Sequence, residues 1–162
     1  MPTTDRPAEH VELLRDAGLR VTAPRLAVLA ELADRPHADA ETVRAAVHAR
    51  LGTVSTQAVY DVLRALTGAG LVRRIEPEGS PGRYELAAED DNHHHAVCRS
   101  CGAVVDVPCA VGHAPCLTAS DDHGFVIDTA EVIYWGTCQA CLAGTTPESP
   151  QPQATAPKKE NA

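Results

Sequence analysis

A chain of 162 residues suits one medium domain or two small ones, and 44% hydrophobic residues are enough for a packed core. Aromatic residues make up only 3%, so Ala, Val and Leu must do most of the packing. The first ten residues are polar, and no apolar run approaches the roughly 20 residues of a membrane span. We therefore expect a cytoplasmic protein with no membrane partner, whose six cysteines more readily bind metal than form disulfides.

The net charge of −8 is unevenly distributed along the chain. Residues 1–84 carry 11 Arg, no Lys and 11 acidic residues, whereas residues 85–162 carry 3 basic and 11 acidic residues. The acidity thus lies in the second half, where carboxylates suit hard cations. The neutral, Arg-containing first half permits DNA binding, because Arg makes bidentate contacts to phosphate and guanine.

Apolar residues recur with helical spacing in four segments of the first half. These predict helices over residues 8–17, 23–33 and 40–51 and from Ser55 to about residue 68. The expected boundary residues are N-caps at Thr22, Asp39 and Ser55 and a C-cap at Gly18.

A two-stranded ribbon follows the helices: residues 71–75, a turn over 76–82, and residues 83–86. Short helices followed by a β-ribbon are the winged-helix order, so residues 1–86 are predicted to form a winged-helix DNA-binding domain.

The second half reads as a smaller domain behind a hinge at residues 87–92. Strands are expected at 96–98, 103–107 and 125–135, within a small α/β dimerisation and metal-binding domain spanning 93–143. Residues 144–162 have the composition of a disordered tail. The predicted fold class is therefore α+β.

Two CxxC knuckles, Cys98-x-x-Cys101 and Cys138-x-x-Cys141, are the strongest local signal. Four thiolates form the tetrahedral sulfur shell that Zn²⁺ favours in structural sites, and Gly102 permits a tight turn. The 36 residues between the knuckles require a folded domain to bring them together. A redox CxxC or disulfides are the alternatives.

A second set of donors surrounds the run His93-His94-His95. In an extended strand His93 and His95 face one side and His94 the other. With Glu85 on the wing, Asp106 on the neighbouring strand and His37 in a loop, they form a mixed N/O set suited to Fe²⁺, Mn²⁺ or Zn²⁺. The alternative is a group of ordinary surface histidines.

The fourth predicted helix has one polar and one aliphatic face. A polar face of this kind fits a helix in the DNA major groove, although an ordinary amphipathic helix has the same pattern. The candidate DNA-binding residues on it are Ser55, Thr56, Gln57, Tyr60 and Arg64.

These motifs, in this order, resemble the ferric uptake regulator (Fur) family over roughly residues 8–142. The matching pieces are Gly18-Leu-Arg-Val-Thr-Ala-Pro-Arg25, His37-Ala-Asp-Ala-Glu41, Val59-Tyr-Asp-Val-Leu63, Gly70-Leu-Val72, the histidine run, Cys98-x-x-Cys-Gly102 and Tyr134-Trp-Gly-x-Cys-x-x-Cys141. Asp91-Asn-His-His-His95 and Cys109-Ala-Val-Gly-His-Ala-Pro-Cys-Leu-Thr-Ala-Ser120 make it most similar to the peroxide-responsive regulators of catalase-peroxidase genes in high-GC bacteria.

The resemblance implies a homodimeric, metal-dependent repressor that binds double-stranded operator DNA and is no enzyme. It matches the four knuckle cysteines to a structural zinc site, and His37, Glu85, His93, His95 and Asp106 to a regulatory Fe²⁺ or Mn²⁺ site where Zn²⁺ may substitute. Metal across the hinge would fix the spacing of two recognition helices. It further implies that Tyr60 contacts base methyl groups and that Arg20 reaches the minor groove.

Two signals are compatible with this resemblance. Peroxide-sensing members of the family use Fe²⁺ to reduce peroxide, and the resulting radical oxidises a ligand histidine. They typically carry Asp at the position of Asp106. Iron sensors carry Glu there, yet Glu85 matches the iron sensors. We expect repression of oxidative-stress genes, with an iron- or other metal-responsive uptake repressor as the alternative.

The chain departs from the family at a further metal site, which is absent or rebuilt here with His94, His113 or His123. Asp61 stands where relatives use Arg or Asn toward DNA. Cys109 and Cys116 match no metal role and are either buried or redox-responsive thiols. A hydrolytic metalloenzyme lacks a supporting pattern such as H-E-x-x-H, and a zinc-dependent interaction module without DNA binding is the remaining rival.

Overall fold

The computed structural model describes residues 6–87, 93–111, 117–127 and 130–145. The chain divides into two compact units. The first comprises the described residues within Met1–His93 and Pro108–Ala130, and the second those within His94–Val107 and Glu131–Ala162. We call them unit 1 and unit 2.

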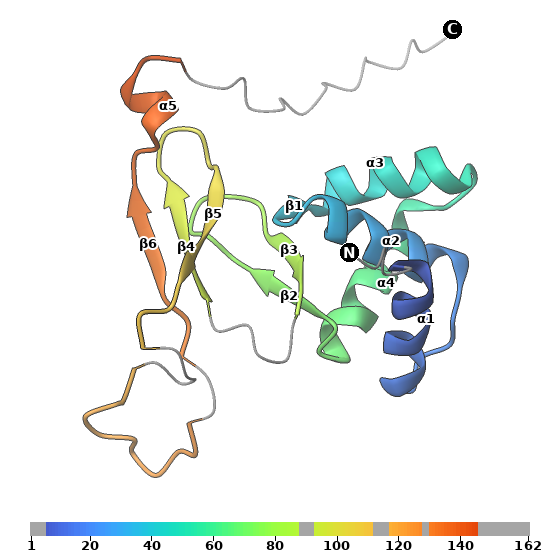
Figure 1. Cartoon of the computed structure of the whole chain (residues 1–162), viewed down its shortest axis with the longest axis horizontal. Coiled ribbons are helices and arrows are strands. Elements are labelled where there is room, and N and C mark those ends of the chain that lie inside the picture. The colour runs from blue at the N-terminus through green and yellow to red at the C-terminus, as the bar shows by residue number, and fades with distance from the viewer. Residues whose placement is uncertain (1–5, 88–92, 112–116, 128–129, 146–162) are drawn as a thin grey trace, which may run out of the picture. The chain divides into compact units, whose positions relative to one another are not determined.

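Unit 1 begins with four helices, which confirms the helical prediction for the first half (Figure 1). They are α1 (Arg6–Asp16), α2 (Ala23–Asp34), α3 (Ala40–Leu51) and α4 (Thr56–Gly68). Gly18 lies two residues after the end of α1 and adopts φ +68°, a conformation that glycine adopts without strain.

The predicted N-caps behave differently. The side chains of Asp39 and Ser55 accept hydrogen bonds from the backbone N–H groups of Thr42 and Ala58, as predicted. Thr22 occupies the N-cap position of α2, but its side chain makes no cap hydrogen bond. Pro24 is the second residue of that helix and has no N–H, so one of the donors that a cap side chain serves is missing.

The predicted two-stranded ribbon is part of a three-stranded antiparallel sheet of order β1-β3-β2. Its strands are β1 (Ala38–Asp39), β2 (Val72–Ile75) and β3 (Arg83–Leu86). The extra strand, β1, pairs Ala38 with Tyr84, so the segment before α3 lies along β3 and forms one edge of the sheet. A two-residue strand is too short for a hydrophobic period to predict it.

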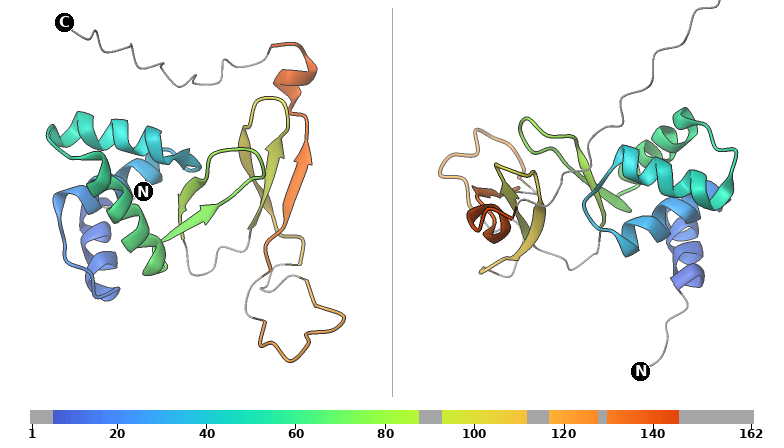
Figure 2. Two further views of the ribbon diagram at one scale, coloured as in Figure 1. Left: turned by 180° about the vertical axis from the view of Figure 1, so that it is seen from behind. Right: turned by 90° about the horizontal axis from the view of Figure 1, so that it is seen from above.

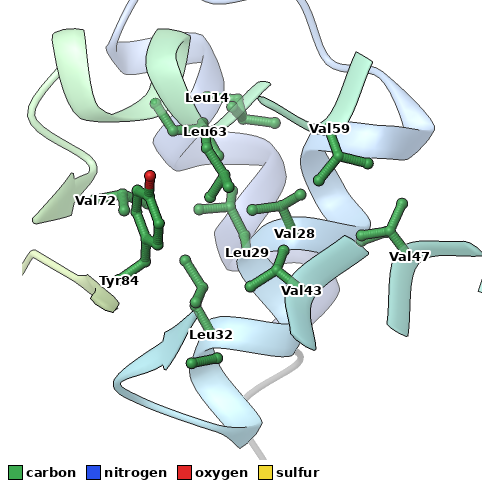
Figure 3. Packing of buried hydrophobic residues seen from close by; sticks show 13 residues of the cluster. Leu14, Val28, Leu29, Leu32, Val43, Val47, Val59, Leu63, Val72 and Tyr84 are labelled. Carbon is green, nitrogen blue, oxygen red and sulfur yellow. The ribbon is translucent and has the colours of Figure 1, made fainter. Parts of the chain in front are cut away.

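The helices and the sheet of unit 1 share one hydrophobic core (Figure 3). Leu14, Leu29 and Leu63 are fully buried helical residues, and Val72 and Tyr84 bring the sheet into the same cluster. Removing one such leucine side chain typically costs about 2–5 kcal/mol. The wing is thus fixed to the helices by packing, and not only by the chain.

Unit 2 is built on a three-stranded sheet of order β5-β4-β6, with β4 in the middle in both figures of the whole chain (Figures 1 and 2). The strands are β4 (His93–Cys98), β5 (Val104–Pro108) and β6 (Ile133–Gly136), followed by the short helix α5 (Gln139–Leu142). The boundary between the units cuts β4 after His93 and β5 before Pro108, so these two end residues are counted in unit 1. β4 and β6 run parallel, with Cys98 opposite Gly136. Parallel strands end at the same edge, so both cysteine knuckles begin there.

The predicted strand over 125–135 is wrong in its first part. Strand β6 begins only at Ile133, and Phe125, Val126 and Ile127 lie outside regular structure with exposed side chains. Hydrophobic sequence alone predicted a strand there, but a strand also needs a hydrogen-bonding partner, which only the fold supplies.

The predicted hinge (87–92) and tail (144–162) fall almost entirely outside the described residues, as do His113 and Cys116. None of the helices in the described segments has the length and apolarity needed to cross a lipid bilayer.

Candidate functional site

The four knuckle cysteines converge in unit 2. The Sγ atoms of Cys98 and Cys141 are 3.8 Å apart, as are those of Cys101 and Cys138, and all four lie within 4.8 Å of one another. A disulfide needs about 2.05 Å, so neither of these pairs is bonded. Zinc–sulfur bonds of about 2.3 Å in a tetrahedron require sulfur atoms about 3.8 Å apart. The cluster therefore fits one Zn²⁺ ion.

Local backbone geometry builds each knuckle. After β4, the Gly102 N–H donates to the Cys98 carbonyl at 2.9 Å, and Gly102 takes φ +70°. The second knuckle starts at Cys138, the N-cap of α5, whose backbone N–H donates to Cys98 Sγ at 3.3 Å. Both turns thus contact Cys98, the first at its carbonyl oxygen and the second at its sulfur.

The thiols differ in acidity. The backbone N–H of Cys138 lowers the pKa of Cys98 to about 6, because it stabilises the thiolate. Burial raises the pKa of Cys141 to about 12. At neutral pH the metal-free cluster therefore holds at least one thiolate and at least one protonated thiol. Zinc binding must release protons, so its affinity rises with pH.

Unit 1 contains one part of the predicted N/O donor set, centred on Glu85. This carboxylate is 3% exposed on β3, and Nε2 of His37 lies 2.9 Å from its Oε2. Nε2 of His93 lies 3.2 Å from Oε1. His37 directly precedes β1 and adopts φ +63°, so the pairing of β1 with β3 positions it beside Glu85. Two imidazoles on one buried carboxylate match the donor types that Fe²⁺, Mn²⁺ or Zn²⁺ accepts.

Arg73 is a residue that the sequence reasoning missed. It lies opposite Glu85 across the β2–β3 pair, and its Nη1 donates to Glu85 Oε1 at 3.0 Å. A buried carboxylate needs such a partner. The hairpin register implied by the 76–82 turn places the two residues opposite each other and was the available signal.

Unit 2 contains the other two predicted donors. His95 on β4 is 2% exposed, and its Nε2 lies 3.8 Å from Oδ1 of Asp106 on the adjacent strand β5. The Asp106 side chain is half-exposed. A histidine and a carboxylate on adjacent strands are thus held at a fixed separation.

Two of the histidines suggested for a further metal site, His94 and His123, contact groups that are not metal ligands of such a site. His94 is buried and its ring packs edge-on against Tyr134, with ring centroids 6.1 Å apart. His123 is exposed and pairs with Asp121. Neither belongs to a group of three or more metal-ligating side chains in the part of the chain that the structure describes.

The candidate DNA-binding residues form an exposed face on α4. Val59, Leu63 and Leu66 bury the opposite face in the core. The exposed residues are Ser55, Thr56, Gln57, Tyr60, Asp61 and Arg64. Ser55 uses its oxygen to cap the helix, which leaves its O–H free to donate. Arg20 is also exposed, and its carbonyl accepts a hydrogen bond from Arg25 at 2.7 Å.

A four-helix unit with a β-wing, a centre of four cysteines and a His/Glu/Asp donor set defines a metal-responsive transcriptional regulator. The sequence pattern of the ferric uptake regulator family matches residues 16–134, and the chain belongs to this family. Membership makes it a regulator and not an enzyme.

Individual relatives agree with this assignment. The chain is 60% identical to the transcriptional regulator FurA of Mycobacterium tuberculosis over 141 residues, covering 87% of this chain and 95% of the relative. It is 30% identical to the peroxide operon regulator of Bacillus subtilis, covering 82% and 91%. The structure of the ferric uptake regulator from Pseudomonas aeruginosa with manganese is 27% identical, with a TM-score of 0.59, covering 80% of this chain and 98% of that one.

Proposed function

We propose that this protein is a metal-dependent, homodimeric repressor that binds operator DNA through residues 1–86 and dimerises through residues 93–143. The observation that carries this proposal is the donor set itself. His37, Glu85 and His93 belong to unit 1, and His95 and Asp106 belong to unit 2. One Fe²⁺ or Mn²⁺ ion shared by both parts would hold the DNA-binding unit in a fixed position, with residues 87–92 as the hinge.

A fixed position matters because a dimer must place two α4 helices in successive major grooves, about 34 Å apart. Without the ion each DNA-binding unit would be free to move, so the two half-sites are not met together and affinity falls. Unit 2 offers exposed apolar residues for dimerisation, among them Val105, Tyr134 and Leu142.

The regulated genes, we propose, are those of the oxidative-stress response. Asp106 beside His95 supports this choice, since an aspartate at this position is typical of the peroxide-responsive members that the sequence resembles. Fe²⁺ held by these histidines and carboxylates would supply the one-electron chemistry that reduces hydrogen peroxide. One of the ligand imidazoles would then be oxidised by the peroxide to an oxo-imidazole, with water as the other product, and loss of that ligand would release the operator.

The alternative is a repressor of metal uptake that responds to iron or another divalent metal, and Glu85 favours it. One experiment separates the two functions. Protein loaded anaerobically with Fe²⁺ is treated with peroxide, assayed for operator binding and analysed by mass spectrometry. Oxygen added to peptides containing His37, His93 or His95, absent from a Mn²⁺-loaded control, supports peroxide sensing. Release by chelation alone, without oxidation, identifies the uptake repressor.

Tyr60 tests the placement of α4 in the major groove. Its side chain is exposed on the polar face of the helix, where its ring can contact a thymine methyl group. Tyr60→Ala should cost on the order of 1–3 kcal/mol at the operator and much less on random DNA. Tyr60→Phe should bind normally, because contact with a methyl group does not need the hydroxyl. Binding is measured by fluorescence anisotropy. Equal losses of affinity on operator and random DNA would show that α4 does not lie in the major groove.

Arg20 tests a contact of a different kind. If it lies near phosphates in the minor groove, Arg20→Ala should weaken binding to operator and random DNA alike. The log–log dependence of affinity on salt should become shallower by about one unit. A salt titration on both duplexes measures this slope. An unchanged slope would place Arg20 away from the DNA.

A further inference from the structure

The polar face of α4 contains an acidic residue that makes two side-chain hydrogen bonds. Nε2 of Gln57 donates to Oδ1 of Asp61 at 2.9 Å, and Nη1 of Arg64 donates to the same oxygen at 3.3 Å. The three residues lie at i, i+4 and i+7, on one face of the helix. Arg64 is the more exposed member of the ion pair, with 76% of its side chain accessible against 53% for Asp61.

We propose that Asp61 is a specificity-determining residue of the DNA-binding face, which positions Gln57 for base readout and withholds Arg64 from phosphates. The inference rests on the proposed function, because it assumes that α4 meets DNA. Asp61 acts through its two neighbours and is therefore a positioning residue.

The bond from Gln57 fixes the orientation of its amide. One hydrogen of Nε2 is used by Asp61, and the second hydrogen and Oε1 remain for a base. This donor–acceptor pair matches N7 and the N6 amino group of adenine in the major groove. An amide free to rotate would present donor and acceptor in either order. Asp61 therefore favours one order before DNA arrives.

The ion pair with Arg64 acts on non-specific binding. Arg64 is a natural phosphate contact because it is exposed and positively charged, and phosphate contacts carry no sequence information. Asp61 neutralises this charge at short range and repels phosphate itself. Exposed ion pairs are weak, so the contacts of a well-fitting operator can break the Asp61–Arg64 pair. Random DNA makes fewer contacts, and breaking the pair therefore costs it a larger share of its binding free energy.

Other arginines of unit 1 are held in the same way. Arg44 pairs with Glu41 on α3, Arg50 with Asp34, Arg74 with Glu76 and Arg83 with Asp39. The pair of Asp61 and Arg64 differs from these because it lies on the polar face of α4, which is the face proposed to contact DNA.

The test uses Asp61→Asn in the full-length, Mn²⁺-loaded protein. Its DNAs are a duplex enriched from a random-sequence pool by the wild-type protein and a scrambled duplex. Asp61→Asn should bind the scrambled duplex on the order of three- to tenfold more tightly at about 0.1 M salt, with a salt slope steeper by about one unit. The ratio of affinities for the two duplexes should fall. Adding Arg64→Ala should restore the scrambled-duplex slope.

Asp34→Asn is the matched control, since it removes one negative charge and an exposed ion pair of similar length, 3.4 Å to Arg50, which keeps Glu31 at 3.9 Å. It should leave the affinity ratio unchanged. If it changes the ratio as Asp61→Asn does, net charge is responsible and the proposal is overturned. Loss of enriched-duplex binding by Asp61→Asn with no change on scrambled DNA would make Asp61 a direct base contact, which also overturns it.

The proposed function fails separately. Wild-type protein that binds no duplex in Mn²⁺, or binds both equally, would refute DNA-specific regulation and this inference with it. Wild-type protein that discriminates between the duplexes, together with an Asp61→Asn variant indistinguishable from it, would refute the role of Asp61 alone.

Discussion

Cys98→Ser is expected to abolish zinc binding and to leave unit 2 unfolded. Cys98 joins the first knuckle to the second, because its sulfur accepts from the N–H of Cys138 and lies 3.8 Å from Sγ of Cys141. Structural zinc in small domains contributes an apparent binding free energy of about 10–16 kcal/mol, and this energy is coupled to folding. The three short strands of unit 2 have no comparable source of stability. We therefore expect a monomeric protein with weak tertiary structure.

Zinc content by elemental analysis, size-exclusion chromatography and thermal unfolding measure this effect. Cys109→Ser is the matched control, since Cys109 lies outside the cluster of four cysteines and should leave zinc and assembly unchanged. A Cys98→Ser protein that remains a full dimer after losing its zinc would show that the metal does not hold unit 2 together.

The second large effect is expected from histidines that belong to different units. His93→Ala removes a donor that contacts Glu85 in unit 1, and His95→Ala removes the partner of Asp106 in unit 2. If one ion is shared, each variant should weaken Mn²⁺ binding at least about 100-fold, the upper end of what loss of an outer-shell partner costs. Each should also lose metal-dependent operator binding. Zinc and dimerisation should be unaffected, because sulfur ligands hold the zinc.

Metal titration monitored by gel shift measures both effects. His123→Ala is the control, because His123 is exposed and lies outside the donor set. Two independent ions would give a different result: each variant would lose one equivalent of metal and keep the other. A parallel loss of zinc would mean that the two ligand sets depend on one another.

The sequence alone was sufficient for the four helices of unit 1 and for the identity of the sulfur site, but it did not predict α5. Helical periodicity and capping residues act over a few positions, so Asp39 and Ser55 could be assigned as caps before any fold was known. The CxxC spacing fixes two sulfurs within one turn, and the donor chemistry then selects zinc. These features depend on neighbours along the chain.

Tertiary structure decided what depends on neighbours in space. Strand β1 exists only because Ala38 meets Tyr84, and the apolar run at Phe125 forms no strand because only the segment from Ile133 pairs with β4. The approach of the two knuckles across 36 intervening residues likewise requires β4 and β6 to end at the same edge.

The partners of charged groups belong to this second class. The composition shows that residues 1–84 have no net charge. It does not show that Arg73 donates a hydrogen bond to the buried Glu85, or that Gln57 and Arg64 both donate to Asp61. An arginine side chain reaches several acidic residues from a given position, and burial and register select among them. The sequence therefore determined which chemical groups this regulator has, and the fold determined which of them meet, because pairing depends on distances that the linear order does not contain.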